Sequence, residues 1–463
     1  MTNTAARGVV SFTGVVHQNL FLPVGGSEVH AVLTLDATCD DPGPRHAVPA
    51  AAEVLILDGS GSMDRDQKRE RAIEAGAAAI EQIRDGVAFA VITGTHEAAM
   101  LWPAAPELRM ADAQTRAEAT QALQALPTAG GTAMGRWLRL ARELLHGHPS
   151  ALRHVTLVSD GRNEHETSQQ LDDAVRSCVG ELRCDSRGVG VDFDPAELYN
   201  VAEKLNGTVR AIANPAELAD DFASITTAAM EKVVEVQLEL STPANAKVRF
   251  VKQTQPMIAE LDPQRPNTTS GTERYLLGAW GTKGRSDSHT YHICIDIEPP
   301  PIDDETPRKT LPTGQLVPAE KLLGRISLAV RDPQPDDPEL VQSFQQFEPD
   351  SSSFTKNRGQ IRAFWTDDPA APLIPNDQVA IVTDSVGLAE DLRAGVVAWR
   401  GGHLDAANNL LRDVRSRAKQ LGNLALKQRL DEVYDERSDS FRLDARDQVE
   451  LFEESTVTTR LDS

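Results

Sequence analysis

Cysteine is scarce in this sequence, and its positions argue against disulfide bonding and against a zinc knuckle. The chain has 4 cysteines in 463 residues, whereas small exported domains that depend on disulfides are much richer in them. Cys178 and Cys184 are the closest pair, and their spacing fits neither a redox Cys-x-x-Cys motif nor a zinc knuckle. We therefore predict reduced, structural thiols at Cys39, Cys178, Cys184 and Cys294.

Long hydrophobic runs are also missing. The opening residues, MTNTAARGVVSFTGVV, contain no apolar stretch long enough for a signal peptide. No other segment approaches the roughly 20 apolar residues that a membrane-spanning helix needs. We therefore expect a cytoplasmic protein without membrane insertion. A secreted adhesin, which needs a signal peptide and usually disulfides, is a poorer interpretation.

Basic residues are in deficit. The chain has 47 Lys and Arg against 69 Asp and Glu, a formal net charge of -22. Such a surface repels phosphate backbones, and no dense block of Lys and Arg offsets that repulsion. We therefore expect no nucleic-acid partner and no binding to anionic membranes. Divalent cations and basic protein surfaces are better candidates.

The pattern of apolar residues divides the chain into several predicted parts. Its length predicts two to four domains. Residues 1–48 carry strands with period-two alternation around Gly25-Gly26, and residues 49–231 alternate short apolar strands with helices. That alternation predicts a doubly wound, mostly parallel α/β sheet covered on both faces. In residues 232–332 the period returns to two, which predicts a β-sandwich. Because the N-terminal strands have no sheet of their own, we expect the α/β domain to be inserted into this sandwich.

The rest of the chain is expected to be a linker, a helical segment and a tail. Residues 333–375 are rich in Pro, Asp and Ser and predict a linker, although QIRAFW within them can form one strand or a short helix. Residues 376–440 predict helices, with Gly401-Gly402 as the turn of one tetratricopeptide-like pair. One such pair cannot bury a core alone, so we expect it to pack on the rest of the protein. Residues 441–463 are acidic and Thr-rich and predict a mobile tail.

Oxygen-bearing side chains follow two predicted strands and open one predicted helix. Asp58-Gly59-Ser60-Gly61-Ser62 comes directly after the buried strand VLILD, and Asp160 ends the strand HVTLVSD. Thr132 lies in the Gly-rich stretch AGGTAMG before a helix. Because loops at the carboxyl ends of parallel strands form the ligand crevice of such sheets, these segments can converge at one edge.

The donor atoms of this set are carboxylates and hydroxyls only. Such hard ligands suit Mg²⁺ first, with Mn²⁺ or Ca²⁺ as alternatives, and the lack of Cys or His argues against zinc. A set dominated by hydroxyls leaves the ion strongly electrophilic. The ion can then accept a further anionic ligand, for which a carboxylate of a partner protein is the natural candidate.

These residues resemble the metal-ion-dependent adhesion site of von Willebrand factor type A domains, whose pattern is Asp-x-Ser-x-Ser with a distant Thr and a distant Asp. The resemblance covers about residues 50–230. It implies that Ser60 and Ser62 bind the ion directly, that Thr132 binds directly or through water, and that Asp58 and Asp160 act mainly through waters. More loosely, the whole chain resembles cytosolic actinobacterial proteins of this type, which names no substrate.

An enzymatic role finds little support in the sequence. Ser60 and Ser62 do not lie in a nucleophile elbow, and the Gly-Ser loop lacks the lysine of a phosphate-binding loop. His165 follows Asp160 closely enough to lie near the rim of the metal site, but a solvated loop histidine is the favoured interpretation. We therefore expect no enzyme. A metal-dependent hydrolase is a distant alternative, because an ion with an open coordination position can activate water.

The predicted function is that of an intracellular adaptor or scaffold whose metal ion bridges to an Asp or Glu of a partner protein. One alternative is an accessory subunit of an ATPase-driven remodelling or metal-insertion complex, with the ATPase on a separate chain. The tail EESTVTT (Glu453–Thr459) adds a hypothesis. A Ser/Thr kinase can phosphorylate an exposed Thr cluster, and an arginine-bearing forkhead-associated module can then bind it. An unmodified terminus is the competing interpretation.

Overall fold

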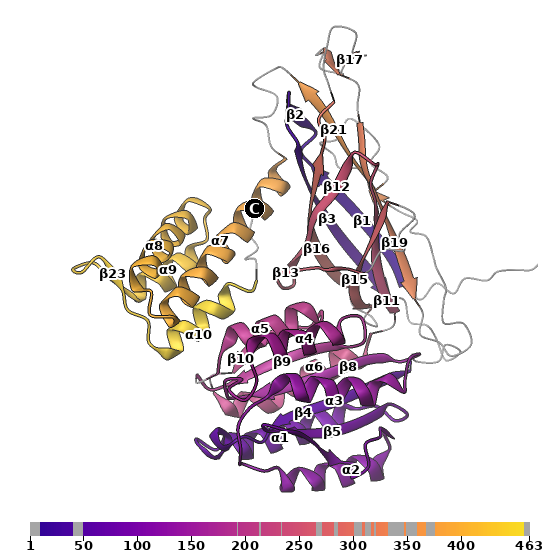
Figure 1. The fold of residues 1–463 in the computed structure, drawn as a ribbon, viewed down its shortest axis with the longest axis vertical. Helices are drawn as coiled ribbons and strands as arrows, with labels where there is room; N and C mark the ends of the chain where they lie inside the picture. Colours follow the sequence, from indigo (N-terminus) through magenta and orange to yellow (C-terminus); the bar gives the residue numbers. More distant parts are fainter. Residues whose placement is uncertain are drawn as a thin grey trace, which may run out of the picture.

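A computed structural model describes residues 10–39, 50–191, 193–212, 214–232, 234–264, 271–281, 286–300, 308–310, 316–318, 321–331, 347–348, 359–366 and 376–457 of the chain. Figure 1 shows three parts. We call them the α/β unit (residues 51–230), the two-sheet unit (the strands within residues 10–39 and 234–366) and the helical unit (residues 377–454). The α/β unit lies at one end of the molecule, the two-sheet unit rises from it, and the helical unit packs beside both (Figure 1).

The α/β unit is built on a mixed, mostly parallel sheet with the order β10-β9-β8-β4-β5-β6, in which β7 also pairs with β5. Its strands are β4 (Ala51–Asp58), β5 (Ala88–Gly94), β6 (Ala98–Trp102), β7 (Arg109–Met110), β8 (Leu152–Ser159), β9 (Arg183–Val189) and β10 (Val209–Ile212). Only β6 and β7 run antiparallel to their neighbour. Its helices are α1 (Lys68–Gln82), α2 (Ala113–Ala122), α3 (Met134–His146), α4 (Ser168–Cys178), α5 (Pro195–Lys204) and α6 (Leu218–Met230), with 3-10 turns η1 (Gly61–Asp64), η2 (Leu123–Ala125) and η3 (Pro215–Glu217).

Helices cover both faces of this sheet, as the alternating pattern predicts. Every residue of the central strand β4 is buried. Alternate β4 side chains point to opposite faces. Val54 and Ile56 pack in the core formed with α3, α4 and α5, while Leu55 and Leu57 pack in the core formed with α1, α2 and α6. The expectation of a doubly wound α/β sheet is therefore confirmed.

The two-sheet unit consists of two six-stranded sheets, with the orders β13-β12-β16-β3-β1-β20 and β14-β15-β11-β19-β21-β2. One apolar core, which includes Leu33, Leu238 and Tyr291, contains buried side chains of both sheets. Its strands are β1 (Val10–Gln18), β2 (Phe21–Pro23), β3 (Glu28–Cys39), β11 (Val234–Ser241), β12 (Ala246–Gln255), β13 (Ala259–Glu260), β14 (Pro263–Gln264), β15 (Thr272–Trp280), β16 (Ser286–Ile297), β19 (Lys321–Arg331), β20 (Phe347–Glu348) and β21 (Gln360–Thr366), beside a separate pair β17 (Arg308–Thr310) and β18 (Leu316–Pro318).

Strands from before and after the α/β unit lie side by side in the first of these sheets. β3 pairs antiparallel with β16, in a register that runs from Thr38 opposite Ser286 to Glu28 opposite Asp296. The chain therefore leaves the two-sheet unit after β3, forms the α/β unit, and returns at β11.

The expectation of a linker over residues 333–375 is wrong where the structure describes this range. β20 pairs with β1, and β21 lies between β19 and β2 in the second sheet. Ile361, Ala363 and Trp365 are fully buried in the shared core. Their alternation makes QIRAFW a core strand, so the Pro- and Ser-rich composition around it is misleading. The remaining residues of the expected linker lie outside the described residues.

The helical unit contains α7 (Asp377–Arg400), α8 (Leu404–Gln420), α9 (Leu424–Glu432), a short pair β22 (Tyr434–Asp435) and β23 (Ser440–Phe441), and α10 (Ala445–Glu454). α7 and α8 form the expected helix pair around Gly401-Gly402. Gly402 has φ +76°, which favours glycine at the turn. Leu392 and Leu411 of this pair share one core with Tyr199 of α5 and with Met257. The expected packing on the rest of the protein is therefore confirmed. Within the described residues, no helix is both long and apolar enough to cross a membrane.

The expectation of a mobile tail over residues 441–463 is wrong up to residue 457. Asp444 caps α10, and Val449, Leu451 and Phe452 of that helix are buried. Ser455 and Thr456 are buried as well, and Thr456 accepts a backbone hydrogen bond from Ile258 at 2.7 Å. The acidic composition hides this helix because its large apolar residues are few. Thr458 and Thr459 lie outside the described residues.

Candidate metal site

Three loops meet at the carboxyl end of the α/β sheet. The loop after β4 is bonded to the loop after β5 through Gly59 N–H and the Gly94 carbonyl, at 2.7 Å. Gly61 N–H donates to the carbonyl of Gly130 at 3.0 Å. Gly130 has φ +90°, a left-handed conformation that favours glycine. The backbone therefore fixes the loops that carry the Asp58 motif and Thr132 against one another.

Four of the five predicted site residues form one hydrogen-bonded chain. Asp58 Oδ1 accepts from Ser60 N–H at 2.8 Å, and the hydroxyls of Ser60 and Ser62 are 2.9 Å apart. The Ser62 hydroxyl donates to Asp160 Oδ1 at 2.6 Å. Asp58 and Asp160 are fully buried, so their carboxylates have little solvent to stabilise them.

Thr132, the fifth predicted residue, faces the same small space beside Gly161. A Cβ atom on Gly161 would lie 2.8 Å from Thr132 Oγ1, 3.6 Å from Ser62 Oγ and 3.8 Å from Asp58 Oδ2. Oxygen atoms from the Asp58 motif and from Thr132 thus surround a point that Gly161, in a third loop, leaves open. The structure brings all five sequence-predicted residues together.

Two residues that the sequence reasoning missed complete the carboxylate environment. Ser159, the last residue of β8, donates its hydroxyl to Asp58 Oδ2 at 2.5 Å. Lys68 Nζ lies 2.8 Å from Asp160 Oδ2, and Lys68 is only 3% exposed. Lys68 is the first residue of α1, and the left-handed residues Asp66 and Gln67 turn the chain before it. The available signal for Lys68 was its position at the start of the helix that follows the Asp-x-Ser-x-Ser motif.

The charge balance of the site favours a cation. Burial raises the pKa of Asp58 to about 6, and the nearby Asp160 charge adds to that rise, against the hydrogen bonds from Ser159 and Ser60. A carboxylate with a raised pKa is one whose negative charge is poorly compensated. A bound divalent ion would supply the missing positive charge.

Two histidines lie along the outer rim of the site. The ring of His165 lies against Gly131, and the ring of His96 lies against Gly130. Their ring centroids are 6.0 Å apart, and both residues are exposed. His165 N–H also donates to the carbonyl of Thr132 at 3.0 Å. His165 is thus the exposed loop histidine that the sequence favoured, and it also lies beside the glycine that precedes Thr132, whereas His96 was not anticipated.

The residues present fit a hard divalent cation. The donors around Gly161 are hydroxyl and carboxylate oxygens, which Mg²⁺, Mn²⁺ and Ca²⁺ prefer. Ser60, Ser62 and Thr132 would hold the ion, and Asp58 and Asp160 would orient the hydroxyls and bound waters. The ion would supply an electrophilic coordination position for an outside oxygen ligand.

Comparison with known proteins agrees with this fold. The family model of the von Willebrand factor type A domain matches residues 52–211. A von Willebrand factor type A protein from Catenulispora acidiphila is 35% identical, with a TM-score of 0.81, over 97% of this chain and 97% of that chain. The protein therefore belongs to the von Willebrand factor type A family.

One more distant likeness concerns the fold. The ArnB paralog VWA2 from Sulfolobus acidocaldarius is 13% identical, with a TM-score of 0.50, over 97% of this chain and 98% of that chain. The proximal thread matrix protein 1 of the mussel byssus, in a structure with a zinc-occupied MIDAS motif, is 19% identical with a TM-score of 0.34 over 40% of this chain and 46% of that chain. No curated protein matches the sequence.

Proposed function

We propose that this protein is an intracellular adaptor that docks partner proteins through a metal ion held by Asp58, Ser60, Ser62, Thr132 and Asp160. The observation that carries the proposal is the convergence of hydroxyl and carboxylate oxygens around Gly161. Members of this family often mediate metal-dependent protein interactions. We further propose that Mg²⁺ is the physiological ion and that the protein acts in the bacterial cytoplasm.

The chemistry of docking follows from the low charge of the hydroxyl ligands. An ion held mainly by neutral oxygens retains most of its positive charge, so an Asp or Glu of a partner is a strong additional ligand. Lys68 adds positive charge beside Asp160. A carboxylate that approaches the ion therefore meets an electropositive site on a chain that is otherwise strongly acidic, with a net charge of -22.

The rest of the chain would present this site. We interpret the two-sheet unit as a β-sandwich into which the α/β unit is inserted, an interpretation supported by the pairing of β3 with β16. Both connections of the α/β unit then leave from the two-sheet unit, before β4 and after α6. The helical unit offers a second surface for protein partners.

The test of the proposal joins metal binding to partner capture. Calorimetric titration of the full chain with Mg²⁺ is expected to give one site that Asp58→Ala/Ser60→Ala removes. A pull-down from native lysate, in Mg²⁺ and in EDTA, is then expected to retain a partner on wild type in Mg²⁺ alone. Ser438→Ala, which changes an exposed serine of the helical unit, is the control and should behave as wild type. Equal partner binding in all samples would contradict metal-bridged docking.

Two alternatives give different results in the same assays. An accessory subunit of an ATPase-driven remodelling or metal-insertion complex would capture a nucleotide-binding protein as the metal-dependent partner. A metal-dependent hydrolase would show turnover that disappears with Asp58→Ala. We propose that the protein is not an enzyme, so a panel of ester and phosphoester substrates is expected to show no such turnover.

The phosphorylation hypothesis is now restricted to Thr458 and Thr459. The Thr456 hydroxyl is buried and donates to the Glu453 carbonyl at 2.7 Å, so a kinase cannot reach it in the folded chain. We retain the proposal that a Ser/Thr kinase modifies the residues beyond it and that a forkhead-associated module binds the product. Mass spectrometry of protein from its native host tests this proposal, and a tail that is never phosphorylated contradicts it.

A further inference from the structure

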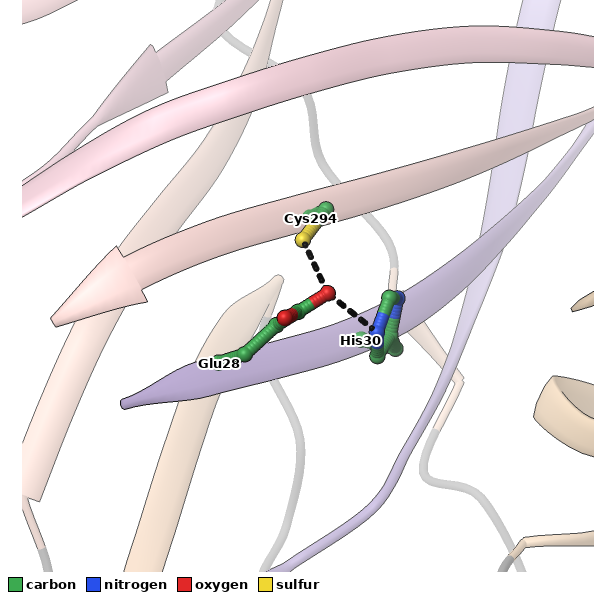
Figure 2. A group of neighbouring side chains, drawn as sticks. All are labelled: Glu28, His30 and Cys294. Carbon is green, nitrogen blue, oxygen red and sulfur yellow. Dashed lines mark hydrogen bonds and ion pairs between the residues drawn. The ribbon is translucent and has the colours of Figure 1, made fainter. Parts of the chain in front are cut away.

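A mixed cluster of metal-ligating side chains lies in the two-sheet unit, where β3 pairs with β16 (Figure 2). Glu28 and His30 come from β3 and Cys294 from β16, and one ligand atom of each lies within 4.8 Å of the others. In a strand, residues two apart share a face, which places Glu28 and His30 together. Cys294 is directly opposite His30 in the register. The backbone therefore brings all three side chains to one face.

This face is opposite to the apolar core. Val29 and Ala31 of β3, and Ile293 and Ile295 of β16, alternate with the cluster residues and are buried in the shared core. The Glu28 and His30 side chains are 39% and 27% exposed, whereas Cys294 is fully buried. An ion can thus reach the cluster from solvent and find a shielded sulfur beneath it.

The distances are close to those of a tetrahedral zinc site. Glu28 Oε1 lies 2.9 Å from His30 Nε2 and accepts from the Cys294 thiol at 3.5 Å. Zinc bonds of about 2.0–2.3 Å to O, N and S place neighbouring ligand atoms about 3.3–3.8 Å apart. His30 Nε2 and Cys294 Sγ lie within 4.8 Å of each other, so side-chain rotations would bring the three atoms to the spacing of zinc ligands.

Neighbouring groups already bind the atoms that would not contact the ion. His30 Nδ1 lies 2.9 Å from Nε2 of His292, so this second histidine can fix the tautomer of the first. Arg249 Nη1 lies 2.8 Å from the second carboxylate oxygen of Glu28. Such outer partners orient the ligands in protein metal sites. Nε2 of His30, Oε1 of Glu28 and Sγ of Cys294 then face one point.

The donor set differs in kind from that of the α/β unit. One sulfur, one imidazole and one carboxylate suit Zn²⁺, whereas Mg²⁺ prefers oxygen alone. Burial and the Glu28 carboxylate raise the pKa of the Cys294 thiol to about 12, so without metal this thiol donates to Glu28. Zinc binding would release the thiol proton to solvent and replace that hydrogen bond by a Zn–S bond.

We propose that Glu28, His30 and Cys294 form a zinc site with water in the fourth position, separate from the site around Asp58. It would join the strand that precedes the α/β unit to a strand that follows it. The role of the ion would be to stabilise the pairing of β3 with β16, the two strands that lie on either side of the α/β unit in the sequence.

Cobalt titration of the full chain tests this proposal, because Co²⁺ bound to a thiolate absorbs in the near ultraviolet and Co²⁺ bound to oxygen ligands alone does not. Wild type is expected to gain one equivalent of this absorption, which Zn²⁺ then abolishes by displacement. Cys294→Ser should lose it. Cys178→Ser, a buried cysteine of the α/β unit, and Asp58→Ala/Ser60→Ala should keep it. Because the Asp58→Ala/Ser60→Ala variant should keep the cobalt absorption, a failure of the zinc site can be distinguished from a failure of the proposed docking site.

Variants at the partly exposed ligands keep the test decisive if Cys294→Ser fails to fold. His30→Gln and Glu28→Gln should weaken zinc binding by more than about 100-fold, and His292→Gln by about 10–100-fold, as expected for an outer partner. Zinc should raise the melting temperature of wild type but not of His30→Gln, with excess Mg²⁺ present in both. No thiolate absorption in wild type, or wild-type affinity in both Gln variants, would overturn the proposal.

Discussion

The strands β4 and β8 contribute to two groups of buried carboxylates, one at each end of the α/β sheet. At the amino ends, Glu53 and Asp185 are both bonded to His154, at 2.7 Å each. At the carboxyl ends, Asp58 and Asp160 lie together, and Lys68 contacts Asp160 at 2.8 Å. Each group has two buried acids and a buried basic side chain, and in the first group Arg183 also contacts Asp185 at 3.2 Å. In the first group the base bridges both acids, and in the second the Asp58 carboxylate is bonded by hydroxyl and amide groups.

The pKa values of the two groups record this difference. Burial alone would lower the pKa of His154, but Glu53 and Asp185 raise it to about 9, so the histidine is charged at neutral pH. Burial raises the pKa of Asp58 to about 6. We call the group of Glu53, His154 and Asp185 the closed cluster, because its charges are paired and support the fold. We call the group around Asp58 and Asp160 the open cluster, because an incompletely compensated carboxylate marks a place for an added cation. The difference between structural and binding clusters therefore lies in how the charge is balanced.

Substitution at the closed cluster should have the largest effect. His154→Leu leaves Glu53 and Asp185 buried without their shared cation, which typically costs about 3–5 kcal/mol of folding free energy. Urea unfolding followed by circular dichroism measures this loss. His146→Leu, at a histidine with a 76% exposed side chain, is the control and should change stability by less than about 0.5 kcal/mol. A loss below 1 kcal/mol for His154→Leu would break the comparison.

The pH dependence of stability should show the same cluster. Because the pKa of His154 is raised from 6.5 to about 9 on folding, its contribution is fully present below pH 6.5 and is lost as pH rises to about 9. A shift of this size corresponds to a contribution on the order of 3 kcal/mol. Unfolding at pH 6.5 and pH 9 should differ accordingly in wild type and much less in His154→Leu. An equal decline in both would assign it to other groups.

Substitution at the open cluster should affect metal binding and leave folding intact. Asp58→Asn keeps the shape of the side chain and removes a poorly compensated charge, so the metal-free protein should be as stable as wild type. Loss of an outer partner weakens metal binding by about 10–100-fold, which calorimetry with Mg²⁺ measures. Asp64→Asn, an exposed acid in η1, is the matched control and should bind like wild type. Global unfolding of Asp58→Asn would contradict the assignment.

Removal of the Lys68 ammonium should have a smaller effect on the Mg²⁺ affinity of the open cluster. Lys68→Met deletes the ammonium beside Asp160, so the site becomes more negative and Mg²⁺ should bind about tenfold more tightly, a change of about 1.4 kcal/mol. The metal-free protein should melt at a lower temperature, and saturating Mg²⁺ should restore it. Lys247→Met, at an exposed lysine of β12, should show neither change. Weaker binding in Lys68→Met would instead give the ammonium a supporting role.

The sequence predicted strands from runs of apolar residues, but it did not reveal which charged side chains are buried in the sheet. VLILD predicted β4 because nearly every residue is apolar. β9 begins at Arg183, and its charged residues do not fit an apolar strand pattern. Asp185 and Arg187 look like surface residues, yet Arg187 is buried against Asp221 at 2.5 Å. A pattern of polarity cannot reveal a buried charge whose partner is distant in sequence.

The candidate site divides in the same way. Its five predicted residues were identified from the motif, from the position of the Asp58 motif and Asp160 at strand ends, and from the position of Thr132 before a helix. The contacts of Lys68 and Ser159 with the carboxylates depend on the conformation of the loops. Asp66 and Gln67 adopt left-handed conformations although neither is glycine, so nothing in the sequence indicates this turn. For α10, the cap Asp444 and the i, i+3 spacing of Val449 and Phe452 were available signals, but the surrounding acids obscured them.

The pairing of β3 with β16 has a consequence for how the chain is made. Residues 40–285 are synthesised between the two strands, which takes about 12–50 s at roughly 5–20 residues per second. During that interval the α/β unit can fold on the ribosome. Until β16 is made, the backbone N–H and C=O groups on that edge of β3 have no strand to pair with. The apolar residues of β3, such as Leu33 and Leu35, are then exposed to chaperones or to other nascent chains. The first long strands to emerge are among the last to be completed.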